Sequence, residues 1–174
     1  MLYQNFLDCN LKELKTKLAK DIKIRDMGKV EFEPYILTDE VDIYAIKSVG
    51  EKETEISKFY NKFINSSDNY LRDDLARIIK ILEKISNNGA KESYFRIEGN
   101  FSDRVCALPL LTIRRNINKH GTLRLYCLRI SNQLLILGSG DLKSSRTYEE
   151  DSNLNQMVDM LQSVDRSLMN LEAN

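Results

Sequence analysis

Basic and proton-transferring side chains gather between residues 119 and 148, on both sides of the most hydrophobic segment of the chain. They are Lys119, His120, Arg124, Lys143, Arg146 and Tyr148. Arginine stays protonated and offers its donors in a planar fork, so it can hold a phosphate but cannot act as a base. Lysine and tyrosine move protons only where their pKa falls from about 10. These residue types predict a site that handles phosphate.

One phosphate reaction uses all of these groups. Attack of a ribose 2′-OH on the adjacent phosphate needs a proton acceptor, a proton donor and positive charge near the non-bridging oxygens. His120 titrates closest to neutrality and is the natural base if the fold brings it near Arg146. The alternatives are that His120, in the turn-like "NKHGT", is merely exposed and that Tyr148 only covers the edge of a sheet.

The charge of the chain is unevenly distributed, although the formal net charge is zero. Residues 91–148 carry ten basic and four acidic side chains, whereas residues 149–174 carry one basic and six acidic side chains. Such asymmetry favours an anionic partner for the basic part. The alternative is that an acidic C-terminal helix packs beside a basic sheet and neutralises it.

Composition indicates one ordered core in a cytoplasmic protein. The chain has 174 residues, 42% of them apolar, with only 7 Gly and 2 Pro. Neither a membrane span nor a secretory signal is evident. Cys9, Cys106 and Cys127 are odd in number and lack CxxC spacing, so we interpret them as reduced core residues. We expect no metal and no cofactor.

The first half of the chain predicts helices around one or two strands. Leucines and isoleucine at helical spacing predict a helix over residues 11–22, and residues 30–50 read as one or two strands with Pro34 near the start. Apolar stripes then predict a helix from Glu51 and a second helix that begins at Ser67 or Asp68 and stops at "NNG". Two helices joined by a short polar linker form an antiparallel hairpin whose shared apolar face needs a sheet to cover.

The second half predicts that sheet. "ESYFRIEG" and "RVCALPLLTIRR" read as strands, with Pro109 confining the second strand to an edge or a bulge. Residues 122–138 read as a hairpin around "SN", followed by a loop at "GSGD". The hairpin's last strand is apolar on both faces, so we expect it to lie centrally, with the helices covering one side. Apolar residues from Leu154 to Leu171 predict a helix that packs on the sheet or presents a seam to a partner or second copy.

Two arginines of the first hairpin strand cannot share one groove. Arg124 and Arg129 are five positions apart, so a regular strand turns them to opposite faces of the sheet. For Arg129 we expect an ion pair with an acid of the C-terminal helix.

This element order, with "LRLYCLRI", "LLILGSGDLKSSRTYEED" and the helix that follows, resembles the RelE/HigB superfamily of bacterial toxins from toxin–antitoxin pairs. The resemblance covers about residues 51–174 and leaves residues 1–50 as an N-terminal extension of a helix and strands. It implies an α+β fold in which a helical hairpin packs on an antiparallel sheet of about four strands, with a C-terminal helix. It also implies a metal-independent endoribonuclease that cuts mRNA, free or on the ribosome, and binds a small antitoxin, often a helix-turn-helix protein.

The resemblance assigns roles by position. Arg124 matches the strand arginine that contacts the scissile phosphate, and Arg146 and Tyr148 resemble a late arginine and tyrosine that stabilise charge, transfer a proton or stack on a base. Arg114 and Arg115 stand where the family often places basic residues, one strand earlier, and with Lys119 we expect them to bind RNA.

The chain departs from the family's pattern after the apolar strand. The consecutive lysines of many members are reduced to Lys143 followed by "SS", and residues 149–151 are three acids that would repel RNA unless they point away. Two alternatives therefore stand beside the toxin. One is a non-catalytic binding or regulatory module of the same fold that holds a protein or nucleic acid. The other is an interaction protein whose extension supplies the partner surface.

Overall fold

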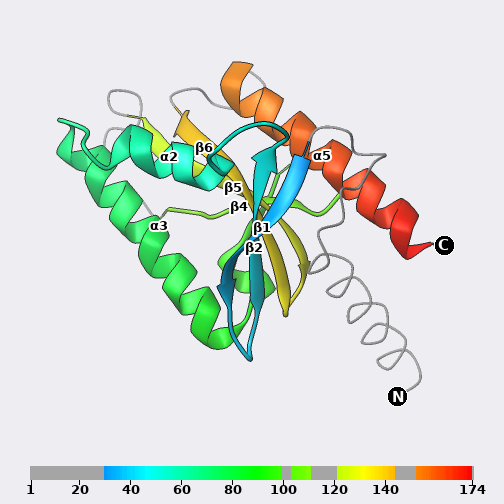
Figure 1. Ribbon diagram of the computed structural model, residues 1–174. Coiled ribbons are helices and arrows are strands. Elements are labelled where there is room, and N and C mark those ends of the chain that lie inside the picture. The colour runs from blue at the N-terminus through cyan, green and yellow to red at the C-terminus, as the bar shows by residue number, and fades with distance from the viewer. Residues whose placement is uncertain (1–29, 99–102, 111–120, 144–151, 174) are drawn as a thin grey trace.

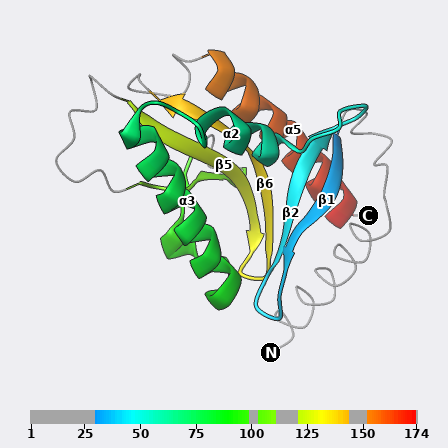
Figure 2. The ribbon, with the colours of Figure 1, turned by 60° about the vertical axis from the view of Figure 1, so that its left-hand side comes forward.

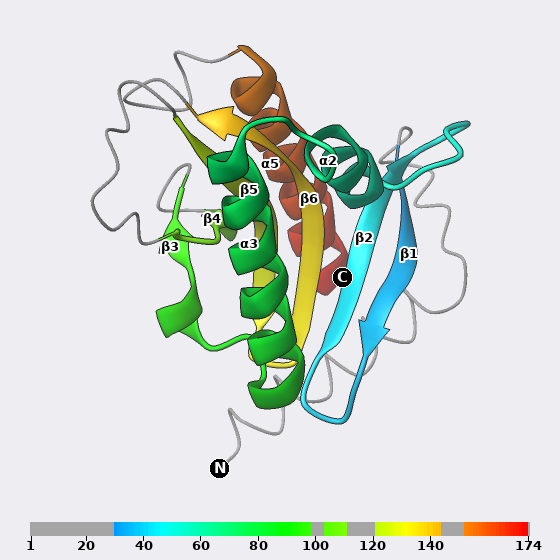
Figure 3. The same cartoon turned by 90° about the vertical axis from the view of Figure 1, so that its left-hand side faces the viewer.

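The computed structural model describes residues 30–98, 103–110, 121–143 and 152–173, which form three layers (Figure 1). Helices α2 (Glu55–Phe63) and α3 (Asn69–Asn88) cover one face of a sheet, and α5 (Ser152–Glu172) covers the other (Figure 3). The α+β class predicted from the sequence is confirmed. The helical hairpin covers one side of the sheet, as expected, and α5 covers the opposite face.

The sheet has six strands in the order β1-β2-β6-β5-β4-β3. Their bounds are β1 Val30–Leu37, β2 Asp42–Ser48, β3 Arg96–Ile97, β4 Val105–Ala107, β5 Thr122–Ser131 and β6 Leu134–Lys143. β2 pairs with β6 in parallel, and all other neighbours are antiparallel. The four antiparallel strands predicted after the helices are present. The sheet is larger and mixed because β1 and β2, from the N-terminal stretch, extend it beyond β6.

The hairpin of β5 and β6 forms the centre of the molecule. Both strands carry fully buried side chains on both faces. Leu125 and Leu137 join the core under α2 and α3, whereas Leu128 and Ile136 join the core under α5. A strand covered on both faces reads as a continuous apolar run, which is the pattern that the sequence presents.

The ends of the helices follow local rules. α2 begins at Glu55 rather than at the predicted Glu51, because Thr54 caps it by accepting from the Ser57 N–H. Asp68, one of the two predicted caps, caps α3 by accepting from the Tyr70 N–H. Gly89 ends α3 with φ +80°, a conformation that a side chain disfavours. α5 buries its apolar seam, from Leu154 to Leu168, against the sheet, so the packing alternative is confirmed over a free seam.

Three strand boundaries differ from the sequence expectations. β3 is confined to Arg96–Ile97, because Glu92–Tyr94 form a short 3-10 helix, η1. β6 continues through "GSGD" to Lys143 because an extra residue between Leu137 and Gly140 is absorbed as a β-bulge. β4 lies between β3 and β5 rather than at an edge, and it ends at Ala107, before Pro109 can remove a ladder donor. Pro34 does lie in an edge strand, β1. The helix predicted at residues 11–22 falls outside the described residues.

Membrane insertion by a helix is not supported in the part of the chain that the structure describes. None of the helices there is both long enough and apolar enough to cross a bilayer.

Candidate functional site

Two of the predicted site residues, Arg124 and Lys143, lie at one end of the β5–β6 hairpin. Arg124 is the register partner of Asp141, and Thr122 is that of Lys143. The other six candidates lie outside the described residues: Arg114, Arg115, Lys119, His120, Arg146 and Tyr148. The segments that hold these six, 111–120 and 144–151, join the described chain at Gly121 and Lys143, at the same end of the hairpin.

Arg124 is already engaged by a carboxylate. Its Nη1 donates to Glu98 Oε1 at 2.9 Å, and Arg96 Nε lies 3.5 Å from the same oxygen. The side chains of Arg124 and Glu98 are only 14% and 8% exposed. We call Arg124, Glu98 and Arg96 the Arg124 cluster. An anionic ligand must compete with Glu98 for the guanidinium, although Glu98 also fixes the orientation of that guanidinium.

The side chain of Lys143 is buried and is not exposed to an incoming anion. The residue is 7% exposed and lies beside Thr122 at the start of β5. Asp74, fully buried on α3, accepts from Thr122 Oγ1 at 3.2 Å and from the Leu123 N–H at 3.1 Å. This carboxylate anchors the strand that carries Arg124. Sequence reasoning missed Asp74, although a charge three residues after Leu71, within an apolar stripe, was a signal for a buried hydrogen-bonding role.

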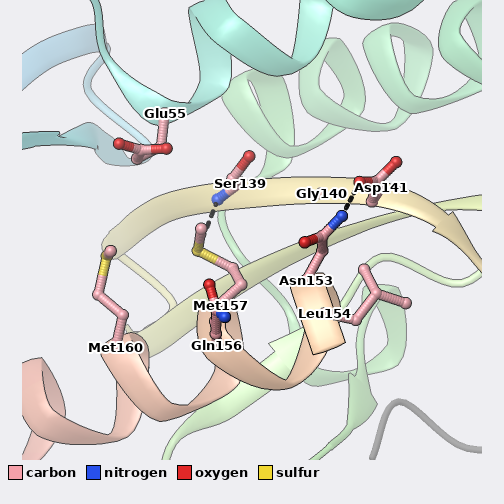
Figure 4. Close-up of a pocket in the computed structure, with 9 residues that line it drawn as sticks. All are labelled: Glu55, Ser139, Gly140, Asp141, Asn153, Leu154, Gln156, Met157 and Met160. Atoms are coloured by element: carbon pink, nitrogen blue, oxygen red, sulfur yellow. Dashed lines mark hydrogen bonds between the residues drawn. The ribbon is translucent and has the colours of Figure 1, made fainter. Parts of the chain in front are cut away.

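A second group of polar side chains lies around Asp141, where β6 faces the last turn of α2 and the first turn of α5. Lys62 Nζ donates to both oxygens of Asp141 at 2.7 Å, the Leu142 N–H donates at 2.7 Å, and Asn153 Nδ2 donates at 3.5 Å. These contacts border a cavity of about 260 Å³ (Figure 4). Its lining comprises Glu55, Ser139, Gly140, Asp141, Asn153, Leu154, Gln156, Met157 and Met160. Sequence reasoning did not find it, because the bulge that opens it was read as a loop.

Arg129 lies on the other face from Arg124, as its spacing predicted. The expected ion pair with the C-terminal helix is wrong, because Arg129 reaches the end of α3. Its Nε donates to Ala90 O at 2.7 Å, its Nη2 donates to Asn132 Oδ1 at 2.7 Å, and its Nη1 lies 3.5 Å from Glu92.

The C-terminal helix pairs with Arg104 instead. Arg104 Nε donates to Asp165 Oδ1 at 2.6 Å, the Arg104 backbone N–H donates to Asp165 Oδ2 at 2.8 Å, and Nη1 donates to Glu172 Oε1 at 2.9 Å. We call Arg104, Asp165 and Glu172 the Arg104 cluster. Here the acidic helix neutralises the basic sheet, as the second reading of the charge pattern proposed.

Local ion pairs therefore account for part of the basic surplus. All four arginines that the structure describes between residues 91 and 143 lie within 4.0 Å of an acid: Arg96, Arg104, Arg124 and Arg129. Four further basic residues between residues 91 and 148 lie outside the described ranges: Arg114, Arg115, Lys119 and Arg146.

The cysteines within the described chain are core residues, as predicted. Cys106 and Cys127 are free thiols, 7% and 0% exposed, and face each other across β4 and β5. Burial raises the pKa of the Cys106 thiol to about 11, although the nearby positive charge of Arg129 partly opposes that rise. Within the described ranges, no group of three or more His, Cys, Asp or Glu side chains could hold a metal ion.

Comparisons with known proteins do not identify a family for this chain. No protein-family model, curated protein sequence or solved structure matches the chain significantly.

Proposed function

We propose that the protein is a RelE/HigB-like toxin of a toxin–antitoxin pair, a metal-independent endoribonuclease that cleaves mRNA, alone or on the ribosome, in the cytoplasm. The observation that carries the proposal is topological. The two segments that hold six of the eight candidate residues join one end of the β5–β6 hairpin, the end that also carries Arg124 and Lys143. A helix-turn-helix antitoxin would occlude that end.

The element order gives further support. A helical hairpin, four antiparallel strands and a C-terminal helix occur in the order that the resemblance implies, from Glu55 to Glu172. The parallel pairing of β2 with β6 places the N-terminal strands on the sheet edge away from β3 and β4.

In this proposal each group acts at a stated step. Arg124 holds the non-bridging oxygens of the scissile phosphate once RNA displaces Glu98 from its guanidinium. His120 accepts the proton of the 2′-OH, and Tyr148 or Lys143 protonates the leaving 5′-oxygen. Lys143 is the weaker of these two donors because it is 7% exposed. Arg114, Arg115, Lys119 and Arg146 bind the flanking phosphates.

A second function has specific support. Arg124 pairs with Glu98 and Lys143 is buried, so both described catalytic candidates are engaged within the protein. A non-catalytic RelE-fold module that binds RNA, DNA or an acidic protein through the same basic segments needs neither residue to be open.

The test compares wild type with the Arg124→Ala/Arg146→Ala double variant in an inducible bacterial host. We expect growth arrest and loss of full-length mRNA with wild type only. Arg166→Ala is the matched control, because Arg166 is an exposed arginine of α5 whose described contact is Ser163. Thermal unfolding of each purified variant separates loss of activity from loss of fold.

Purified protein then separates the two functions. Tight binding of labelled RNA without cleavage, and without growth arrest, would replace the toxin by the binding module. Folded wild type that does not arrest growth and binds neither RNA, DNA nor an acidic protein would refute both.

A further inference from the structure

The two edges of the sheet differ in whether another strand can pair with them. β1 forms the edge that lies across the sheet from α3 (Figure 2). Pro34 lacks an N–H there, and the register shifts between Pro34 and Ile36, both of which protect an edge from further pairing. β3 forms the other edge (Figure 3) and has neither feature. β3 is therefore the edge that can accept a strand.

Ile97 presents both its backbone and its side chain at this edge. The Glu98 N–H donates to the Val105 carbonyl of β4 at 3.0 Å, and successive residues of a strand turn their backbone groups to opposite sides. The N–H and C=O of Ile97 therefore point away from β4, and neither has a partner among the described residues. The Ile97 side chain is 69% exposed, more than any other large apolar residue in the described chain. A partner strand would form backbone hydrogen bonds here and cover that side chain.

The exposed side chain lies on the face of the sheet that α3 covers. Ile97 is the register partner of Cys106, which belongs to the core under α2 and α3. Tyr94 of η1 packs against the same core. Arg124, in contrast, projects from the α5 face, because its neighbours Leu123 and Leu125 belong to the core under α2 and α3. The surface around Ile97 is therefore separate from the proposed phosphate site, and a ligand can bind there whether or not the protein cleaves RNA.

Three exposed lysines border this surface without a counter-ion. Lys80 and Lys84 lie one turn apart on α3, and Lys91 lies one turn before Tyr94, whose N–H donates to the Lys91 carbonyl at 3.0 Å. The Lys84 Nζ lies 4.8 Å from the centre of the Tyr94 ring. Within the described ranges none of the three lysines has an acid within 4.0 Å, whereas every lysine of β2 and α2 is ion-paired. This surface therefore carries positive charge that the described protein does not neutralise.

We propose that the β3 edge binds an extended acidic segment of a partner protein, which adds an outer strand beside β3. An apolar residue of that segment lies opposite Ile97, and carboxylates two positions before and after it share the α3 face, since side chains alternate along a strand. Those carboxylates meet the unpaired lysines, which would repel a basic segment. RNA phosphates would also attract the lysines, but they offer no strand to the backbone of Ile97.

The test is NMR titration of the full-length protein with a peptide of the sequence Ser-Glu-Thr-Val-Thr-Glu-Ser, blocked at both ends. We expect a millimolar dissociation constant and shifts in the amide signals of Lys84, Tyr94 and Ile97. A matched peptide with lysine in place of each glutamate should bind at least about tenfold more weakly. Equal binding of the two peptides, or shifts confined to residues outside this surface, would overturn the proposal.

Two variants decide whether the β3 edge is responsible. Ile97→Pro removes the outward N–H without breaking a hydrogen bond to β4, and the triple variant Lys80→Gln/Lys84→Gln/Lys91→Gln removes the unpaired charge. Each should weaken binding of the acidic peptide at least about tenfold. Lys52→Gln is the matched control, because Lys52 is an exposed lysine between β2 and α2, and it should leave binding unchanged. Should Ile97→Pro unfold the protein, the lysine variant decides. Unchanged affinity in either folded variant would contradict the proposal.

A single-stranded oligouridylate is the competing probe. We expect it not to displace the acidic peptide, because the proposed phosphate site lies on the other face of the sheet. Displacement of the peptide would mean that the lysines serve a nucleic acid, and would rule out the protein segment. Peptide binding that persists in a protein with no ribonuclease activity would leave this proposal standing while the toxin function fails.

Discussion

The Arg104 cluster and the Arg124 cluster are both built on an ion pair between an arginine and a carboxylate. Each joins an arginine in or beside a sheet strand to a buried carboxylate. Asp165 is 1% exposed in its side chain and receives two donors from Arg104, one from the guanidinium and one from the backbone. Glu98 is 8% exposed and receives one hydrogen bond from Arg124, with Arg96 beside it.

The difference separates a structural contact from one that can exchange. Removing Asp165 leaves both a backbone N–H and a guanidinium without their partners, so no small anion can replace it. The single bond between Arg124 and Glu98 can be replaced by a phosphate oxygen, because both accept from the same guanidinium. The Arg104 cluster therefore fixes α5 to the sheet, whereas the Arg124 cluster leaves an arginine that a ligand can recruit.

The largest expected effect comes from Asp165→Ala. This change removes the buried acceptor of both the Arg104 Nε and the Arg104 backbone N–H, leaves only the partly exposed Glu172 beside the guanidinium, and should lower the free energy of unfolding by about 3 kcal/mol. Urea unfolding followed by circular dichroism measures it. Glu172→Ala, which removes a carboxylate that is 30% exposed, should cost no more than about 1 kcal/mol. Similar losses for the two variants would contradict the structural role assigned to Asp165.

The next largest effect is expected for Gly140→Ala, because Gly140 lies against the backbone of Arg124. A Cβ at Gly140 would overlap the carbonyl oxygen of Arg124 and come within 2.9 Å of the Phe59 ring. The strands must shift, and we expect a loss of about 2–3 kcal/mol in the free energy of unfolding, measured by the same urea titration. Gly138→Ala, whose Cβ would lie 3.1 Å from Leu161 and 3.1 Å from the Tyr126 carbonyl oxygen, should cost less because these are tight contacts rather than an overlap. The opposite ranking would contradict the strand geometry at the bulge.

A smaller effect on stability, with a clear effect on binding, is expected for Glu98→Gln. The substitution keeps the shape of the side chain and one acceptor for Arg124 but removes the negative charge from a buried pair, so the free energy of unfolding should fall by about 1–2 kcal/mol. RNA should bind about three- to tenfold more tightly, because the phosphate no longer competes with a carboxylate. Fluorescence anisotropy with a labelled RNA over a series of salt concentrations measures the affinity. Weaker binding would mean that Glu98 positions Arg124 rather than restrains it.

The smallest effect at neutral pH concerns Cys106, whose Sγ donates to the carbonyl of Arg104. Its pKa is raised from 9.0 to about 11, so the folded state keeps the thiol proton longer than the unfolded chain does. Below about pH 9 both states are protonated and stability is unaffected; between about pH 9 and 11 the unfolded chain ionises first and stability falls. Urea unfolding at pH 8 and pH 10.5 should show a smaller pH-dependent loss for Cys106→Ala than for wild type. Equal losses would mean that other groups, such as Tyr44 with its raised pKa, dominate.

Local patterns predicted most of the elements of this fold. The stripe from Leu71 to Ile85 predicted α3 and its end at Gly89, and the apolar runs around "SN" predicted the β5–β6 hairpin. Such patterns depend on the conformational preferences and the burial of residues that are close together in the sequence. They failed at "GSGD", where glycine and aspartate suggest a loop, because a β-bulge and the contact of Gly140 with β5 depend on residues far away in sequence.

The sequence predicted which face of the sheet each arginine occupies, but it did not predict which acid or carbonyl each arginine contacts. Spacing placed Arg124 and Arg129 on opposite faces, since strand alternation is a local rule. Nothing local tied Arg124 to Glu98 or Arg129 to the end of α3, and the acid expected for Arg129 pairs with Arg104 instead. Charge composition predicts that acids and bases meet, but not which of them meet.

By itself the sequence determined the helices, the antiparallel strands, the buried cysteines and the segregation of charge, because periodicity, capping and composition act over a few residues. Only the tertiary structure decided that β2 lies parallel to β6, that α5 covers the second face, and that Glu55 meets Ser139 at a cavity. The segments joined by the first and third of these features lie more than 80 residues apart. Their pairing is selected by how the apolar faces of all the elements fit together, which no local stretch encodes.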